Sequence, residues 1–245
     1  MSGDAEPRSD VPELHLRPYR QLIPRPTSAV VGGLAPWSAM SAGERRPIPL
    51  SLVVARLGPV MAHPSDSPAH RPHAAVLVPL FDREGEAMVV LIRRSFSLAI
   101  SPGDLAFPGG RLEPGEASLD AALREAEEEV GIGRHSVSVL GSLPLVERPT
   151  RGGSVLPYIG TLGSEPLLRP QPGEVEAVFT VALSDLAADA AYWEEEWHIP
   201  GEGSRRLCFF ADPQVLGDDV VWGMTAMLLR GLLAAVLAPE AAAGE

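Results

Sequence analysis

The chain has 245 residues, a formal net charge of −12, a single cysteine at Cys208 and 45% apolar residues. A chain of this length can bury the core of one domain, with or without an extension, and one cysteine excludes an internal disulfide framework or a metal cluster built from cysteines. The acidic balance disfavours non-specific nucleic-acid binding, and no signal peptide or membrane span is evident, so we expect a cytoplasmic protein without nucleic-acid or membrane partners.

Proline is concentrated near the N-terminus, where residues 1–72 hold 12 of the 25 prolines. Because proline fixes φ and removes a backbone donor, regular helices and inner strands are disfavoured there. We therefore predict a partly ordered extension over residues 1–72, with a short ordered piece near residues 49–57. A domain is expected over residues 73–238, followed by a tail at residues 239–245.

Two short apolar runs begin the expected domain. Residues 74–80 and 87–92 are almost entirely apolar, and the polar segment 82–85 between them is typical of a turn, so they predict a hairpin of buried strands. Together with the elements that follow, they indicate an α/β fold with a mixed sheet between helical layers. The later elements are a proline- and glycine-rich loop at 101–110, helices at 118–130, 184–190 and 219–237, and strands at 137–145, 155–162, 175–181 and 208–210.

The helix expected over residues 118–130 has an apolar face with the i, i+3, i+4, i+7 spacing of a buried side. Ser118 suits the N-cap, and Gly131 lies where a left-handed C-cap residue is expected. The apolar face consists of Leu119, Ala122, Leu123, Ala126 and Val130.

The other face of this helix carries three carboxylates, Glu125, Glu128 and Glu129, whose spacing makes them project together. Like charges at this spacing repel by roughly 0.2–0.5 kcal/mol per pair, and the helix dipole disfavours anions near the C-terminal end. Bound divalent cations would remove the repulsion, and ligands that are all oxygen indicate Mg²⁺ or Mn²⁺. The alternative is a solvated acidic face, since glutamate is a good helix former.

The loop before the helix adds to the metal interpretation. Its Phe107-Pro-Gly-Gly110 sequence lets the backbone approach a ligand or metal closely, because glycine has no Cβ. Glu116 and Arg124 are available for an ion pair that would hold the loop against the helix.

The whole segment from Gly110 to Ile132 resembles the Nudix box, G-x5-E-x7-R-E-U-x-E-E-x-G-U, in which U is aliphatic. The resemblance implies an α-β-α sandwich with a mixed β-sheet and a loop-helix-loop catalytic motif, and hydrolysis of a nucleoside diphosphate linked to another group X. The fixed positions are filled by Gly110, Glu116, Arg124, Glu125, Glu128, Glu129 and Gly131, and the aliphatic positions by Ala126 and Ile132.

The same resemblance implies roles for single residues. The helix carboxylates are similar to the family's metal ligands, the Gly110 carbonyl is similar to a further ligand, and Mg²⁺ or Mn²⁺ is the implied cofactor. Glu116 and Arg124 look like the pair that fixes the loop geometry, while Glu125 is also a candidate for the base that activates water. The implied catalytic residues are Glu116, Arg124, Glu125, Glu128 and Glu129.

Upstream residues resemble the motif of the coenzyme A pyrophosphatase subgroup, L-L-T-x-R-S-x3-R-x3-G-x-V-x-F-P-G-G. The likeness implies cleavage of CoA or an acyl-CoA to 3′,5′-ADP and 4′-phosphopantetheine, with Arg94, Ser95, Gly109 and Gly110 contacting the substrate. A downstream segment resembles the subgroup's E-V segment and adds Glu174 as a metal ligand or base. The matching motif residues are Leu91, Arg94, Ser95, Gly103, Phe107, Pro108, Gly109 and Gly110.

One position departs from this motif, since Ala99 stands where the motif has arginine. Arginine grips phosphate with a bidentate fork, which alanine cannot do, and the chain has no lysine to replace it. Two alternatives therefore stay open: the same chemistry on ADP-ribose, a dinucleotide or a nucleoside triphosphate, and a non-catalytic binding or regulatory module on this scaffold. The sequence also leaves a homodimer open.

Overall fold

The computed structural model describes residues 21, 23–58, 71–147, 153–199 and 203–238. The tail expected at residues 239–245 and much of the extension expected at residues 1–72 lie outside this described part. No helix among the described residues has the length and apolar character needed to cross a membrane.

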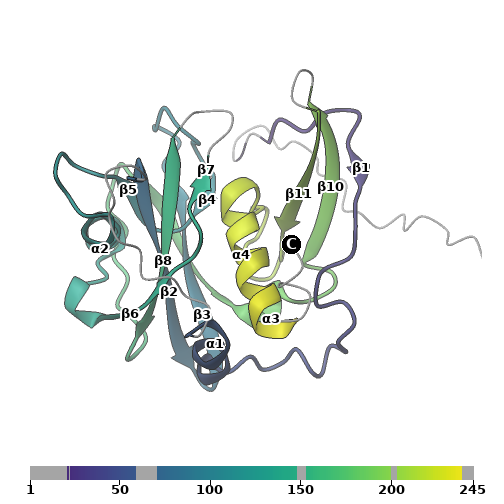
Figure 1. Ribbon diagram of the computed structural model, residues 1–245, viewed down its shortest axis with the longest axis horizontal. Coiled ribbons are helices and arrows are strands. Elements are labelled where there is room, and N and C mark those ends of the chain that lie inside the picture. Colours follow the sequence, from purple (N-terminus) through teal and green to yellow (C-terminus); the bar gives the residue numbers. More distant parts are fainter. Residues whose placement is uncertain (1–20, 22, 59–70, 148–152, 200–202, 239–245) are drawn as a thin grey trace, which may run out of the picture.

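The centre of the fold is an eight-stranded sheet (Figure 1). Its main path runs β4-β3-β2-β8-β6, with β5 paired to β2, β7 to β8 and β9 to β3. The β2–β8 pair is parallel and the other pairs are antiparallel, so the sheet is mixed, as predicted. The strands are β2 (Ala74–Arg83), β3 (Glu86–Arg94), β4 (Leu105–Ala106), β5 (Gly109–Arg111), β6 (Val137–Ser142), β7 (Val146–Glu147), β8 (Ser154–Leu162) and β9 (Val175–Ala182).

The predicted hairpin is confirmed by the antiparallel pairing of β2 with β3. Glu84 and Gly85 connect the two strands, and both have positive φ, +56° and +85°. Two consecutive residues with positive φ match the twist of a tight hairpin, which explains why a glycine stands at the second position.

Helices cover both faces of this sheet, which confirms the expected α-β-α sandwich (Figure 1). Alternate residues of β2 point to opposite faces: Leu77 packs toward α2 (Ser118–Val130), and Val78 packs toward α4 (Gly223–Leu237). The short helices α1 (Leu50–Leu57) and α3 (Leu183–Leu186) contribute to the same core as α4. A 3₁₀ turn, η3 (Arg134–Ser136), follows α2.

A second sheet lies beyond α4, so that this helix is enclosed between two sheets (Figure 1). Its strands are β1 (Val30–Val31), β10 (Tyr192–Ile199) and β11 (Gly203–Phe210), in the antiparallel order β1-β10-β11. The sequence predicted a strand only at residues 208–210 of this sheet. The remainder of β10 and β11 is rich in charged residues and shows no apolar run.

The described part of the N-terminal extension packs against the core. Trp37, Ile48 and Leu57 are buried in the cluster that includes one face of the central sheet. The Trp37 indole donates a 2.9 Å hydrogen bond to the Ala187 carbonyl, and the Ile48 amide donates to the Glu86 carboxylate. The boundary at residue 72 stays a prediction.

Four of the expected elements have other ends in the structure. Ala117, and not Ser118, is the N-cap of α2, because the buried Ser118 hydroxyl lies 2.7 Å from the Tyr158 hydroxyl. The last helix begins at Gly223, since Val221 is still extended and bridged to Phe210. The strand expected at 137–145 ends at residue 142, and the helix expected at 184–190 is the shorter α3.

Candidate active site

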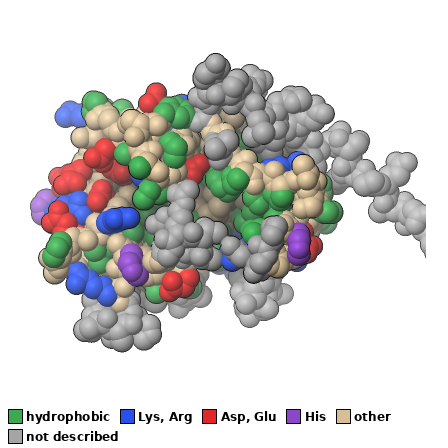
Figure 2. All heavy atoms as spheres, turned by 90° about the horizontal axis from the view of Figure 1, so that it is seen from above, with side chains coloured by type: hydrophobic (Ala, Val, Ile, Leu, Met, Phe, Trp, Pro, Cys, Tyr) green, Lys and Arg blue, Asp and Glu red, His purple; other side chains and the backbone are tan. Residues whose placement is uncertain are grey.

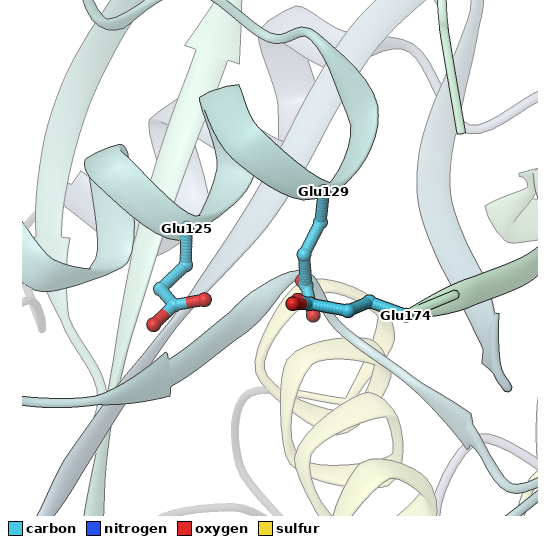
Figure 3. Close-up of side chains that lie close together, drawn as sticks. All are labelled: Glu125, Glu129 and Glu174. Atoms are coloured by element: carbon cyan, nitrogen blue, oxygen red, sulfur yellow. The ribbon is translucent and has the colours of Figure 1, made fainter. Parts of the chain in front are cut away.

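Three carboxylates from two elements meet beside the C-terminal half of α2. One oxygen from each of Glu125, Glu129 and Glu174 lies within 4.8 Å of the others. Figure 3 shows the Glu129 and Glu174 carboxylates meeting, while Glu125 approaches from the preceding turn of the helix. We call these three residues the carboxylate cluster.

Glu129 is the most deeply buried member of the cluster, with 3% of the residue exposed. Burial raises its pKa to about 7, and the neighbouring charges of Glu125 and Glu174 act in the same direction. The Gly109 amide, which donates a 2.9 Å hydrogen bond to Glu129 Oε2, and the positive charge of Arg94 oppose that rise. A carboxylate held in this way gains stability from a cation beside it.

Glu125 is half-buried, and burial raises its pKa as well. Arg124 opposes the rise by donating a 3.0 Å hydrogen bond to Glu125 Oε1. The backbone of Gly110 lies directly against this carboxylate, so that a Cβ at position 110 would come closer than 3.0 Å to it. A side chain at position 110 would therefore displace the Glu125 carboxylate from its place against the backbone.

Gly109 is required for a different reason. Its φ is +151°, and a Cβ there would come closer than 3.0 Å to the backbone of Ala75 and Val76 on β2. The loop can thus pair with β2 and still aim the Gly109 amide at the cluster.

Arg124 joins the loop to the helix, which confirms the predicted pair with Glu116. Its guanidinium makes two hydrogen bonds to the Glu116 carboxylate, at 2.8 and 3.1 Å, and the Glu116 pKa is lowered chiefly by this contact. Arg124 also donates to the Arg111 carbonyl at 3.2 Å and to Glu128 Oε2 at 3.0 Å. The Glu128 side chain is 58% exposed and lies outside the carboxylate cluster, held on the Arg124 side of the helix.

Glu174 reaches the cluster because the segment before β9 closes the C-terminal end of α2. The Arg169 amide donates to the Val130 carbonyl and the Gln171 amide to the Glu129 carbonyl, each at 2.9 Å. These contacts satisfy carbonyls that a helix end leaves unpaired. Gly131 adopts the predicted left-handed C-cap conformation, with φ +76°.

The two predicted substrate residues outside the glycine loop lie at the end of β3. Arg94 is near enough for its charge to lower the Glu129 pKa, and Ser95 is tied to the cluster by a 2.8 Å hydrogen bond from its amide to the Glu174 carbonyl. Ala99 is exposed in the loop that follows.

The donor set fits a hard divalent cation. The cluster consists only of carboxylate oxygens, and the Gly110 backbone lies directly against Glu125. Figure 2 shows acidic side chains gathered on the side of the molecule where Figure 1 places α2.

Sequence reasoning missed the contacts that arrange this site. Gly109 was expected to contact substrate, and the hydrogen bond from its amide to Glu129 was not predicted. The caps supplied by Arg169 and Gln171 carry no sequence signal, because they are made by backbone amides.

The chain is similar in sequence to several known proteins. Residues 71–200 match the sequence model of a family described as "NUDIX domain". Nudix hydrolase 3 of Caenorhabditis elegans is 38% identical over 138 residues, which span 54% of this chain and 57% of that protein. NudL of Yersinia enterocolitica, described as an uncharacterized Nudix hydrolase, is 33% identical over 184 residues, which span 75% of this chain and 91% of that protein. A solved Ap4A hydrolase of C. elegans in a binary complex covers 49% of this chain and 85% of its own, with 23% identity and a TM-score of 0.40, a likeness that carries no further conclusion.

Proposed function

This chain belongs to the Nudix family, hydrolases of pyrophosphate bonds in nucleotide derivatives, and from that premise we propose that its substrate is coenzyme A or an acyl-CoA. The products are 3′,5′-ADP and 4′-phosphopantetheine. The observation that carries the proposal is the position of the carboxylate cluster. It lies beside Gly109 and Gly110, which we call the glycine loop, and beside Arg94, and all three of these residues belong to the segment that resembles the CoA motif.

The family generally needs divalent metal ions, and we propose Mg²⁺ or Mn²⁺. Glu125, Glu129 and Glu174 would hold the metal, and the Gly110 carbonyl and Glu128 are further proposed ligands. A bound metal of this kind neutralises charge on the phosphates and lowers the pKa of water.

The chain's own residues have distinct proposed tasks. Arg94 binds a phosphate oxygen through its guanidinium, and Ser95 and the glycine loop line the same site. Glu125 accepts the proton of the attacking water at a carboxylate oxygen. Glu116 and Arg124 keep the loop and the helix at a fixed separation, so that the Gly109 amide stays on Glu129.

Ala99 favours a second candidate function. Without an arginine at this position, one phosphate contact of the CoA motif is missing, and this would matter less for ADP-ribose, a dinucleotide or a nucleoside triphosphate. A non-catalytic module is the third candidate. The buried Glu129 argues against a non-catalytic module, since a buried carboxylate lowers the stability of the fold and would serve no function there.

A panel assay on the full chain tests these candidates. CoA, acetyl-CoA, ADP-ribose, NADH and dNTPs would each be incubated with Mg²⁺ or Mn²⁺ and their products identified by mass spectrometry. We expect CoA or acetyl-CoA to be cleaved fastest, with Glu129→Gln as the control for contaminating hydrolases. Faster cleavage of ADP-ribose, NADH or a dNTP would establish the second candidate, and no cleavage of any compound would favour the third. A cytoplasmic location and a homodimer stay predictions.

A further inference from the structure

The backbone of Arg94 is held by a loop as well as by the sheet. The register between β3 and β9 shifts between Arg93 and Arg94, so the regular ladder is interrupted there. The Arg94 amide donates to the Asp104 carbonyl at 3.0 Å, and the Gly103 amide donates to the Arg94 carbonyl at 3.1 Å. The position of Arg94 therefore depends on the position of residues 103–104.

That loop is fixed in turn by the segment that leads into α4. The Trp222 indole N–H donates a 2.9 Å hydrogen bond to Asp104 Oδ1. The Gln21 side-chain amide pairs with the backbone of Val220, accepting from its N–H at 3.1 Å and donating to its carbonyl at 2.8 Å. The Trp222 ring also packs against the small apolar cluster around Phe209, so the indole has little freedom to turn away.

The same segment holds the residue next to Arg94. Asp219, whose side chain is fully buried, accepts a hydrogen bond from the Arg93 guanidinium, which lies 5.2 Å from the centre of the Phe179 ring. Arg93 Nε and Asp219 Oδ1 are buried without a partner among the described residues. A buried pair that leaves groups unsatisfied is a poor source of stability, which points to a role in fixing geometry.

We propose that the segment Asp219–Trp222 is a positioning element that holds Arg94 beside the carboxylate cluster, through Asp219 on Arg93 and Trp222 on Asp104. The extra residue of the register shift lies on β9, so Arg93 and Arg94, which are consecutive on β3, still point to opposite faces of the sheet. Anchoring Arg93 on the α4 side leaves the Arg94 guanidinium on the α2 side, where the cluster lies. This inference rests on the proposed function, in which Arg94 contacts a substrate phosphate.

A double-mutant cycle tests the positioning role with CoA and Mg²⁺, or with ADP-ribose if CoA is not cleaved. Trp222→Phe keeps an aromatic ring and removes the N–H, and Asp104→Ala removes the acceptor. Each should raise KM about fivefold to tenfold with a much smaller change in kcat. Asp104→Asn keeps an acceptor oxygen and should recover most of that loss. Trp193→Phe is the matched control, because it also removes an indole N–H, the one that donates to Glu195, and leaves the Trp222 bond to Asp104 in place.

The cycle is completed in an Arg94→Ala background, where Trp222→Phe should have no further effect on KM. An equal effect with and without Arg94 would overturn the proposal, because it would indicate a general structural role. Unchanged kinetics in Arg94→Ala alone would overturn it as well, since Arg94 would then not contact the substrate.

Amide hydrogen exchange tests the positioning of Arg94 without depending on the proposed enzymatic activity. In Trp222→Phe, peptides covering residues 94–104 should exchange faster, while peptides from α2 and β8 should match wild type. Unchanged protection over 94–104 would overturn the positioning role even in an active enzyme. Faster exchange in a protein that cleaves no compound would support the positioning of Arg94 and count against the proposed function alone.

Discussion

The Gly109 amide donates a 2.9 Å hydrogen bond to Oε2 of Glu129, joining the start of β5 to the end of α2. This bond holds a carboxylate that burial would otherwise favour in its protonated form. The site thus keeps a proton acceptor or metal ligand in place before any ligand arrives.

The variants Glu129→Gln and Glu128→Gln each neutralise one carboxylate of α2, the first buried and the second exposed. Both should keep the fold and lower kcat by on the order of 100-fold or more at saturating Mg²⁺, because each removes a carboxylate charge near the metal. Steady-state kinetics and circular dichroism would measure this. Full turnover in Glu128→Gln would exclude a role for Glu128 at the metal, and full turnover in Glu129→Gln would exclude the cluster as the site.

Gly110→Ala should displace the Glu125 carboxylate, since the new Cβ would come closer than 3.0 Å to it. A displacement of this kind costs on the order of 100-fold in kcat. Gly133→Ala is the control, because its nearest neighbour is Glu127 Oε1 at 3.9 Å, an ordinary contact. Equal activity of the two variants would contradict the close packing described for Gly110.

The stability of the metal-free protein should fall as pH rises from 4.5 to about 7. Burial raises the folded-state pKa of Glu129 to about 7 from its ordinary 4.5, so the stability associated with the protonated form is present at low pH and lost as pH rises through 7. The loss is on the order of 3 kcal/mol. Thermal unfolding in EDTA would show it.

The Glu129→Gln variant is the control for this pH dependence, since its side chain does not titrate. The difference between its Tm and that of wild type should grow toward pH 8, and added Mg²⁺ should raise the wild-type Tm most at that end. Parallel curves for the two proteins would contradict the assignment to Glu129.

Cys208 should resist alkylation in the folded protein. It is buried, and burial raises the pKa of its thiol to about 12, so very little thiolate is present at pH 8. Mass spectrometry after iodoacetamide treatment should show slow labelling in buffer and rapid labelling in guanidinium chloride. Because the chain has one cysteine, a single mass shift reports it. Rapid labelling without denaturant would show that the β11 region opens readily.

The local parts of this structure were predictable because their causes are local. Glu116 and Arg124 lie eight residues apart on one loop and helix, and their pairing follows from that spacing. Gly131 was predicted as a left-handed C-cap because it follows the last residue of the apolar helix face. Gly85 was predicted to lie in a turn because it ends a polar segment between two apolar runs.

The parts that escaped prediction depend on long-range contacts. Glu174 was named from a resemblance, but its approach to Glu129, 45 residues earlier in the chain, depends on backbone amides that close the end of α2. Ser118 has the side chain of an N-cap, yet the hydroxyl of Tyr158 on β8 holds it instead. The strands β10 and β11 bury Glu195 against Arg25 and Trp197, a pairing that an apolar pattern cannot reveal.

The enclosed position of α4 has a practical consequence. The family match ends at residue 200, yet Leu229 and Leu233 of this later helix share one core with Trp37, which precedes the match. A fragment trimmed to the matched residues would leave one side of the central sheet bare and would be expected to aggregate. The stretch that the family model matches is therefore smaller than the packed core, and variants that probe the chemistry belong in the whole chain.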